Sequence, residues 1–280
     1  MTIARLVADA APALTPAERR VAETVLSDPH AVAFGTVAQL AAESRTSGPT
    51  VVRFATKLGL AGFAELQAQA QAEITDALRP ATARIRERPQ ADIVGQALAA
   101  DVENVRTTLE AVSPRDFDGA VALLSDRNRR VFVLVGEIAR GAGVALVTQL
   151  DLLRDDIVAL GGSPVRVARQ LAELEPGDVV VVIEHRRYER WLLDVLERAR
   201  DADAVVVALT DRSLSPVATD AAFVFVVSAR GVGPFDSHTG TFALIHALAA
   251  GVAARSRRRA TTRLDAVEQA WRADDALVDV

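Results

Sequence analysis

Apolar residues recur with two different periods along this chain. Up to about residue 127 they return every three or four positions, which is the spacing of amphipathic helices. Beyond that point, short Val-rich runs alternate with helix-compatible segments; the runs are VFVLV at 131–135, DVVVVI at 178–183, AVVVAL at 204–209 and FVFVV at 223–227. Strands that are apolar throughout are buried on both faces of a parallel sheet. The pattern predicts a helical amino-terminal part and an α/β carboxyl-terminal part.

Three hydroxyl residues mark helix beginnings in the first part. Thr15, Thr36 and Ser47 each precede apolar residues at helical spacing, and a side-chain oxygen there can accept a hydrogen bond from a free N–H group of the first turn. Thr15 is also followed by Pro16 and Glu18, which is the form of a capping box. The predicted helices cover 16–27, 37–43, 48–58 and 62–78.

The middle and the end of the chain differ from these two parts. Residues 79–89 contain two prolines and four arginines, which predicts a linker. A single apolar stripe runs along 90–112, and further helices are predicted at 114–125 and 237–254. We therefore predict domains at 1–78 and 128–254, with a linker and packing helices at 79–127 and a basic stretch followed by a helix at 255–280.

Composition excludes several classes of protein. With 280 residues, half of them hydrophobic, the chain is longer than a usual single domain. Cysteine is absent, which excludes disulfides and thiolate chemistry, and with only four histidines we expect no metal and no other cofactor. Neither a membrane span nor a signal peptide is indicated, so we expect a cytoplasmic protein. The net charge of −5 argues against a general polyanion coat, although DNA binding needs only a local basic surface.

Residues 36–60 have the layout of a helix-turn-helix, in which the second helix enters the major groove of DNA. Apolar residues of both helices can face inward, among them Leu40, Val51 and Leu58. The residues that we expect at the DNA are Arg45, Ser47, Gly48, Thr50, Arg53 and Lys57. The same spacing also suits a small helical bundle that serves dimerisation.

The amino-terminal sequence closely resembles the DNA-binding domain of the RpiR family of bacterial transcriptional regulators. The resemblance lies in LTPAERRVAETVLSDP, TVAQLAAES and SGPTVVRFATKLGLAGFAELQ. Members of that family typically show S-x-x-T-V-V-R-F followed by K-L-G and G-F, and the residues on this pattern run from Ser47 to Phe63. One departure is Arg45-Thr46, where the family usually has Gly-Val. The resemblance implies a double-stranded DNA operator as partner.

Residues 128–254 resemble the sugar isomerase (SIS) domain of the same family, a flavodoxin-like parallel sheet that binds phosphosugars. LTDRSLSPVATDA is the most specific segment, being similar to the family's I-T-x-x-x-x-S-P-L-A-x-x-A-D. The fold class implied is α plus α/β: a helical helix-turn-helix domain followed by a parallel-sheet SIS domain.

The phosphate-binding motifs of an SIS domain are altered in this chain. The family's G-x-G-x-S after the first strand becomes GEIAR, which keeps Gly136 but places Arg140 at the Ser. The family's S-x-S-G-x-T becomes EHRRYE, with Glu184, Arg186, Arg187 and Glu189 at the Ser, Ser, Gly and Thr positions. Hydroxyl groups and glycines cradle a phosphate because they approach it closely, and nearly all of them are gone.

Three interpretations of these charges are open. The arginines could bind an anion through charge-assisted hydrogen bonds. Glu184 and Glu189 could instead pair with Arg140, Arg186 or Arg187 and fill the pocket with salt bridges. The charges could also simply face solvent. The candidate ligand-binding residues are Gly136, Arg140, Glu184, Arg186, Arg187 and Ser215.

Other residues near this site have two interpretations each. Ser215 falls on the family pattern, but Ser215-Pro216 could merely cap a helix. His185 and His238 with Glu184 would suit acid–base catalysis in an isomerase, yet lone histidines are more often surface or packing residues. The Gly-rich segment 230–240 could rim the pocket or be an ordinary loop.

The sequence predicts a regulator without enzymatic activity. Its helix-turn-helix would bind an operator, and its SIS domain would sense a small anionic metabolite, such as a phosphosugar or a sugar acid, and dimerise. Two DNA half-sites require two recognition helices, so we expect a homodimer or a dimer of dimers. The alternatives are a phosphosugar isomerase with a helical appendage and a regulator whose pocket has lost ligand binding.

Overall fold

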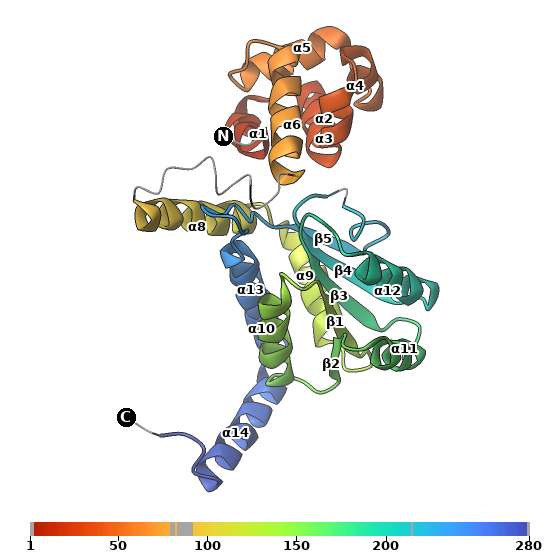
Figure 1. Cartoon of the computed structure of the whole chain (residues 1–280), viewed down its shortest axis with the longest axis vertical. Coiled ribbons are helices and arrows are strands. Elements are labelled where there is room, and N and C mark those ends of the chain that lie inside the picture. The colour runs from red at the N-terminus through yellow and green to blue at the C-terminus, as the bar shows by residue number, and fades with distance from the viewer. Residues whose placement is uncertain (1–2, 79–81, 83–91, 214, 279–280) are drawn as a thin grey trace. The chain divides into compact units, whose positions relative to one another are not determined.

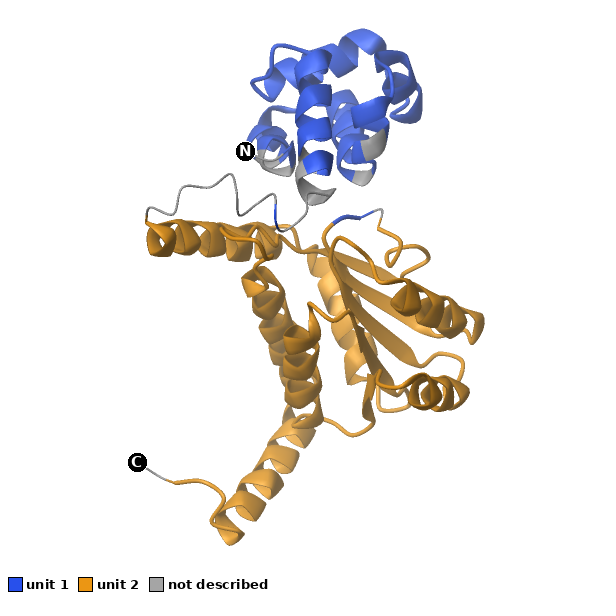
Figure 2. Ribbon diagram, viewed as in Figure 1, with its two compact units in different colours: residues 1–89, 212–214 blue, residues 90–211, 215–280 orange. Residues whose placement is uncertain are grey.

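A computed structural model describes residues 3–78, 82, 92–213 and 215–278. The chain divides into two compact units, the first made of 1–89 with 212–214 and the second of 90–211 with 215–280 (Figure 2). The linker predicted at 79–89 lies outside the described residues, apart from 82. The predicted domain boundaries stay predictions.

The first unit is helical, as predicted. Its elements are α1 (Ile3–Ala10), the 3-10 helix η1 (Ala11–Ala13), α2 (Pro16–Ser27), α3 (Pro29–Phe34), α4 (Val37–Glu43), α5 (Gly48–Lys57) and α6 (Phe63–Leu78). Thr15 and Thr36 form capping boxes with Glu18 and Gln39, so both predicted helix starts are confirmed. Apolar residues of α2, α4, α5 and α6 form one buried cluster that fixes α4 and α5 against α2.

The second unit contains a parallel five-stranded sheet with helices on both faces (Figure 1). The strands are β1 (Val131–Val135), β2 (Ile157–Leu160), β3 (Val179–Glu184), β4 (Val205–Thr210) and β5 (Phe223–Val226), in the order β2-β1-β3-β4-β5. The four predicted strands are confirmed, whereas β2 was not predicted. The helix expected after β4 is wrong, because turns occupy 215–220.

Alternate residues of the strands point into two separate hydrophobic cores. Residues of odd number in β1 and β3, such as Val133 and Val181, face α9 (Pro114–Ser125), α10 (Arg140–Asp151) and α13 (Thr239–Arg255). Residues of even number, such as Phe132 and Val180, face α11 (Pro164–Ala172) and α12 (Arg190–Asp201). This explains why β1 and β3 are apolar without alternation.

Helix α8 (Ile93–Glu110) belongs to the second unit and makes polar contacts with the rest of it. Asn104 and Thr108 are buried; Asn104 Nδ2 donates to the carbonyl of Arg230 at 2.9 Å, and the amide of Ser228 donates to Thr108 Oγ1 at 2.9 Å. The apolar stripe that predicted this helix remains largely exposed, with Val94 at 82%. Helix α14 (Arg257–Ala273) follows α13. None of the described helices is both long and apolar enough to cross a membrane.

Candidate functional site

The turn between α4 and α5 is closed by backbone hydrogen bonds around Arg45. Its amide donates to the carbonyl of Ala42 and the amide of Thr46 donates to that of Ala41, at 3.1 and 2.8 Å, which forms a Schellman motif. Arg45 takes the left-handed position of that motif with a φ of 51°. The guanidinium of Arg20 donates to the carbonyls of Ser44 and Arg45, each at 3.3 Å. Sequence reasoning missed Arg20, which ties this turn to α2.

The amino-terminal end of α5 carries a chain of polar contacts. Ser47 Oγ lies 2.9 Å from Thr50 Oγ1, and Arg53 Nη2 donates to Thr50 Oγ1 at 3.3 Å. Ser47 begins the helix as predicted, but its side chain makes no capping hydrogen bond to the backbone. Thr50 was expected at the DNA, but it is only 7% exposed and therefore does not lie on the outer face of α5. Gly48 is half-buried against Val37.

The buried stripe of α5 explains which residues remain outside. Val51, Phe54, Ala55 and Leu58 face the core at intervals of three, one and three residues, and Thr50 lies at the edge of this stripe. The exposed residues of the turn and of α5 are Arg45, Ser47, Pro49, Val52, Arg53, Thr56 and Lys57. Val52 is apolar but lies outside the buried stripe and is 42% exposed. An exposed valine on a recognition helix can contact a thymine methyl group.

Lys57 has a structural partner inside the first unit. Its Nζ lies 2.6 Å from Glu18 Oε2 and donates to the carbonyl of Ala13 at 2.9 Å. The hydrogen bond from Lys57 is the main reason that the pKa of Glu18 falls to about 2. Glu18 is buried and also accepts hydrogen bonds from Thr15. Lys57 therefore joins α5 to α2. The sequence predicted a DNA contact for Lys57 and did not predict this structural role.

At the carboxyl edge of the sheet, Glu184 occupies the place expected for a phosphate cradle. It pairs in register with Thr210 of β4, and it is only 4% exposed. A Cβ atom added to Gly136 would lie 1.9 Å from Glu184 Oε2, so the carboxyl group packs directly over the Gly136 backbone after β1. Glu184 Oε1 accepts the amide of His185 at 3.0 Å, whereas Oε2 has no hydrogen-bond partner among the described residues.

The surroundings of Glu184 favour its protonated form. Burial raises the pKa of Glu184 to about 7, and the nearby carboxylates of Glu189 and Asp211 add to this rise. Glu189 in turn accepts hydrogen bonds from the amide of Glu137 and from the indole of Trp191. A phosphate in this position would meet two carboxyl groups in place of the hydroxyl groups of the family motif.

The arginines of the site have other partners than the predicted ones. Arg186 forms a two-pronged ion pair with Asp236, from the loop before α13, and both side chains are largely buried. Arg140 pairs with Glu137 at the surface. Arg187 is exposed and has a φ of 63°, at the position where the family motif has Gly. Of the three open interpretations, the salt-bridged one holds only in part: ion pairs are present in this region, but among the described residues none of them joins Glu184 to an arginine.

Several buried polar atoms near this edge have no partner within the described residues. They are Glu184 Oε2, His185 Nδ1, Ser215 Oγ and both ring nitrogens of His238. Ser215 begins a turn and not a helix, so the interpretation as a helix cap is wrong.

The two histidines lie beside each other. The rings of His185 and His238 are 5.2 Å apart, and His185 Nε2 lies 3.2 Å from Thr241 Oγ1. Burial lowers the pKa of His185 to about 4 and also lowers the pKa of His238. Both rings are therefore neutral at pH 7, which is typical of packing histidines and does not favour a general acid.

A cavity of about 820 Å³ lies beside the altered cradle, between α10, α11 and α12. Glu137, Arg140, Glu189 and Trp191 line it on the side of the cradle. Arg166 and Arg198 line it too, together with apolar residues of β1, α10 and α11. Of the predicted ligand-binding residues, Arg140 lines this cavity, whereas Arg186 is held by Asp236.

Comparison with known proteins covers both units. Residues 1–77 match the helix-turn-helix domain of the rpiR family, and residues 123–251 match the SIS domain. The sugar isomerase domain of an RpiR transcription factor from Sphaerobacter thermophilus is 31% identical, with a TM-score of 0.58 over 63% of this chain and 98% of that chain. The chain belongs to the RpiR family.

Other relatives of this RpiR protein agree with the family assignment. The HTH-type transcriptional regulator HexR of Pseudomonas aeruginosa is 29% identical over 199 residues, which are 70% of this chain and 69% of HexR. The Vibrio vulnificus NanR protein complexed with ManNAc-6P shares the fold over 99% of both chains, with a TM-score of 0.57 and 18% identity. The RpiR chain is thus a transcriptional regulator with a helix-turn-helix domain and an SIS domain, and the predicted fold class is confirmed.

Proposed function

We propose that this regulator binds a specific operator through Arg45 and the exposed face of α5. The observation that carries the proposal is that Arg45 and Arg53 both lie exposed at the turn and on α5, and neither side chain has a carboxylate partner within the described residues. Their charges are thus available to phosphates and base edges. Ser47 and Val52 are exposed on the same helix and its cap, where they would meet bases.

Operator binding requires two recognition helices, and we infer that the chain forms a homodimer. The exposed stripe of α8 supports this assignment; its apolar residues are Ile93, Val94, Leu98, Val102 and Leu109. Such a contiguous apolar surface on a soluble regulator is typical of a protein interface. The two polar residues that hold α8 to its own unit, Asn104 and Thr108, lie away from this stripe, so pairing would leave them undisturbed.

We infer that the effector is a small anionic metabolite that binds in the cavity beside the altered cradle. Arg140, Arg166 and Arg198 line this cavity, and they offer charge-assisted hydrogen bonds to a carboxylate or a phosphate. NanR of Vibrio vulnificus was solved with ManNAc-6P, which makes a phosphosugar one candidate. In this chain its phosphate would have to avoid the position that Glu184 fills.

One observation favours a second candidate, a regulator without a small-molecule effector. Glu184 fills the cradle, and Arg186 is already neutralised by Asp236. A thermal-shift titration with phosphosugars and sugar acids separates the two candidates. If the cavity binds the effector, at least one compound raises the melting temperature, and Arg140→Ala reduces that shift. If no compound acts on the wild type, the candidate without an effector stands.

Operator binding is tested with Arg53→Ala, after the operator has been selected from a random DNA pool. We expect weaker binding and an unchanged melting temperature. The slope of the logarithm of operator affinity against the logarithm of salt concentration should fall in magnitude by about 1 for each phosphate that the variant no longer neutralises. Arg115→Ala is the matched control, because Arg115 is an exposed arginine of the second unit. Equal operator affinity of wild type, Arg53→Ala and Arg115→Ala would contradict the proposed interface.

A further inference from the structure

The cavity of about 820 Å³ beside the altered cradle contains an exposed tryptophan. Trp191, in the first turn of α12, is 40% exposed and lines the cavity. Its indole N–H donates to Glu189 Oε2, while Glu189 Oε1 accepts the amide of Glu137 after β1. These two hydrogen bonds hold the indole in place. The cavity therefore offers a flat aromatic surface whose orientation is already set.

Helix α12 arranges three chemical groups along this cavity. Trp191, Asp194 and Arg198 follow one another at intervals of three and four residues, so they lie on one side of the helix, and all three are exposed. Trp191 and Arg198 are about 10 Å apart along the axis, at 1.5 Å per residue. Within the described residues, neither Asp194 nor Arg198 has an ion-pair partner. An aromatic ring, a carboxylate and a guanidinium group thus line the cavity in that order.

The turn after β2 provides room for a phosphate at the same cavity. Gly161 and Gly162 line it and precede α11, which Ser163 caps. Gly162 has a φ of 110°, and a Cβ atom added to Gly161 would meet nothing within 4 Å. Arg166 of α11 also lines the cavity and has no ion-pair partner in the described part of the chain. A phosphate that Glu184 excludes from the cradle would find open space and a cation here.

We propose that the effector of this cavity is a nucleoside phosphate, with its base on Trp191 and its phosphate on Arg166 and Arg198. Every nucleobase has a flat face that can stack on an aromatic side chain. Arginine binds phosphate oxygens through charge-assisted hydrogen bonds. Asp194 lies between the two ends along α12, where its carboxylate can accept hydrogen bonds from ribose hydroxyl groups. This inference rests on the proposed effector site and names the class of its ligand.

The wall of the cavity favours a nucleoside phosphate over a phosphosugar. A sugar ring carries hydroxyl groups on most of its carbons, and each needs a polar partner when it is buried. Of the described residues that line the cavity, Thr148 has the one hydroxyl side chain, and none has a side-chain amide. Most of the uncharged lining residues are apolar, and Val144 among them is 60% exposed. A nucleobase can cover such a surface with the face of its ring.

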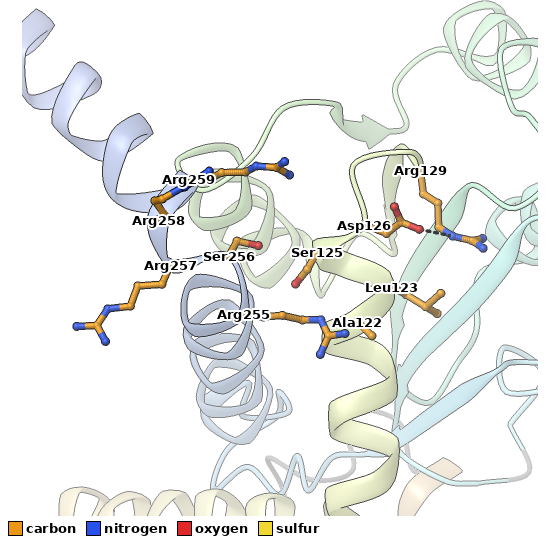
Figure 3. Close-up of a pocket in the computed structure, with 10 residues that line it drawn as sticks. All are labelled: Ala122, Leu123, Ser125, Asp126, Arg129, Arg255, Ser256, Arg257, Arg258 and Arg259. Carbon is orange, nitrogen blue, oxygen red and sulfur yellow. Dashed lines mark hydrogen bonds and ion pairs between the residues drawn. The ribbon is translucent and has the colours of Figure 1, made fainter.

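A second arginine-lined cavity lacks the aromatic wall. Figure 3 shows this cavity, of about 700 Å³, where α13 joins α14; Arg129, Arg255 and Arg257 are among the residues that line it. None of its described lining residues is aromatic. Its arginines could attract any small anion and do not define a class of ligand. Arg257 therefore serves as a control for the arginines of the effector cavity.

Tryptophan fluorescence tests the inference directly, because the chain contains two tryptophans, Trp191 and Trp271. In the Trp271→Phe protein the signal comes from Trp191. The probes are the four ribonucleoside 5′-monophosphates, their nucleosides and ribose 5-phosphate. We expect at least one nucleotide to quench the signal and to bind more tightly than its nucleoside and than ribose 5-phosphate. Absence of quenching by every nucleotide, or ribose 5-phosphate binding as tightly as the best nucleotide in calorimetry, would overturn the inference.

Four variants examine the two ends of the ligand separately by calorimetry. Trp191→Leu should weaken nucleotide binding about tenfold because stacking is lost, whereas Trp191→Phe keeps a ring and should retain most of the affinity. Arg198→Ala should weaken binding of the nucleotide but not of its nucleoside, and Arg257→Ala should change neither. Circular dichroism confirms that each variant is folded. Equal nucleotide affinity of the two Trp191 variants, or of the two arginine variants, would contradict the assignment.

Failure of this inference can be distinguished from failure of the proposed effector site. If a phosphosugar raises the melting temperature, Arg140→Ala reduces that shift and no nucleotide binds, the cavity is an effector site and the nucleoside phosphate is wrong. If neither phosphosugars, sugar acids nor nucleotides bind the wild type, the effector site fails together with this inference.

Discussion

Arg45 and Arg187 both stand where the RpiR motifs usually have glycine, and both keep a left-handed backbone, with φ values of 51° and 63°. A residue with a side chain in this conformation costs about 1–2 kcal/mol relative to its usual one. The fold has therefore retained the shape of each turn although the residue suited to it is gone. For Arg45, an exposed charge beside α5 is a function that glycine could not supply.

Arg45→Gly should therefore separate stability from DNA binding. We expect the free energy of unfolding to rise by about 0.5–1 kcal/mol, because relief of the left-handed strain exceeds the freedom gained by the unfolded chain. Operator affinity should fall, and so should its salt slope. Arg45→Asn is the control, since asparagine tolerates this conformation but carries no charge. Urea unfolding and gel-shift titrations check both effects; unchanged operator affinity in both variants would exclude a phosphate contact.

Glu184 makes the stability of the second unit depend on pH. Its pKa is about 7 in the folded protein, against 4.5 for an ordinary Glu, so the folded state holds its proton more tightly than the unfolded state does. Stability is then greatest below pH 4.5 for this group and is lost as the pH rises toward 7. Above pH 7 the carboxyl group is charged, while Oε2 has no partner in the described structure.

Glu184→Gln should remove this pH dependence, because an amide has a similar shape and does not titrate. At pH 8 we expect the variant to exceed the wild type in unfolding free energy by roughly 2–3 kcal/mol, with a much smaller difference at pH 5. Urea unfolding at the two pH values provides the measurement. Glu175→Gln is the control, since Glu175 is 81% exposed. A constant difference between pH 5 and 8 would rule out this role for Glu184.

At the scale of elements, one ion pair joins the recognition helix to its support. Lys57 at the end of α5 reaches the buried Glu18 in the first turn of α2, while Arg20 of α2 holds the carbonyl groups at the end of α4. Lys57 and Arg20 thus connect helices through polar contacts, in addition to the contacts within the apolar cluster. The orientation of α5 thus depends on α2 as well as on its own hydrophobic stripe.

Lys57→Met should therefore act mainly on stability. It leaves a buried carboxylate without its cation, and we expect a loss of about 1–2 kcal/mol, between the values for exposed and for buried ion pairs. The pKa of Glu18 is about 2, so the ion pair stabilises the protein above pH 4.5 and this contribution is lost as the pH falls toward 2. The deficit of the variant, measured by urea unfolding, should shrink over that range. Glu18→Gln with Lys57→Met is the control and should recover part of the loss at pH 7.

The elements that the sequence predicted well are those with local signals. Thr15 and Thr36 cap helices as expected, and the Val-rich runs are strands, because buried parallel strands have no polar face. Strand β2 was missed because it is a four-residue edge strand that is only partly buried. Partners far apart in sequence were missed too: the pairings of Lys57 with Glu18 and of Arg186 with Asp236 depend on tertiary contacts.

At the scale of the whole molecule, a dimeric regulator fixes the spacing of its DNA sites. If two copies present one α5 each to the same face of the duplex, the half-sites lie about 10 bp apart, or a multiple of this. An insertion of about 5 bp between the half-sites turns one of them to the opposite face and should reduce affinity to that of a single half-site. An insertion of about 10 bp is the control. Gel-shift titrations on the three operators check this; equal affinity for all three would contradict a rigid dimer.

The ion pair at the end of α5 also has a practical consequence, because Lys57 is the single lysine of the chain. An amine-reactive reagent can acylate no other side-chain amine in this protein. Acylation at this position removes the positive charge and leaves Glu18 without its cation. The labelled protein would therefore show how strongly the position of α5 depends on this ion pair. Operator DNA that covers α5 should slow the labelling, and mass spectrometry of one peptide would follow the reaction.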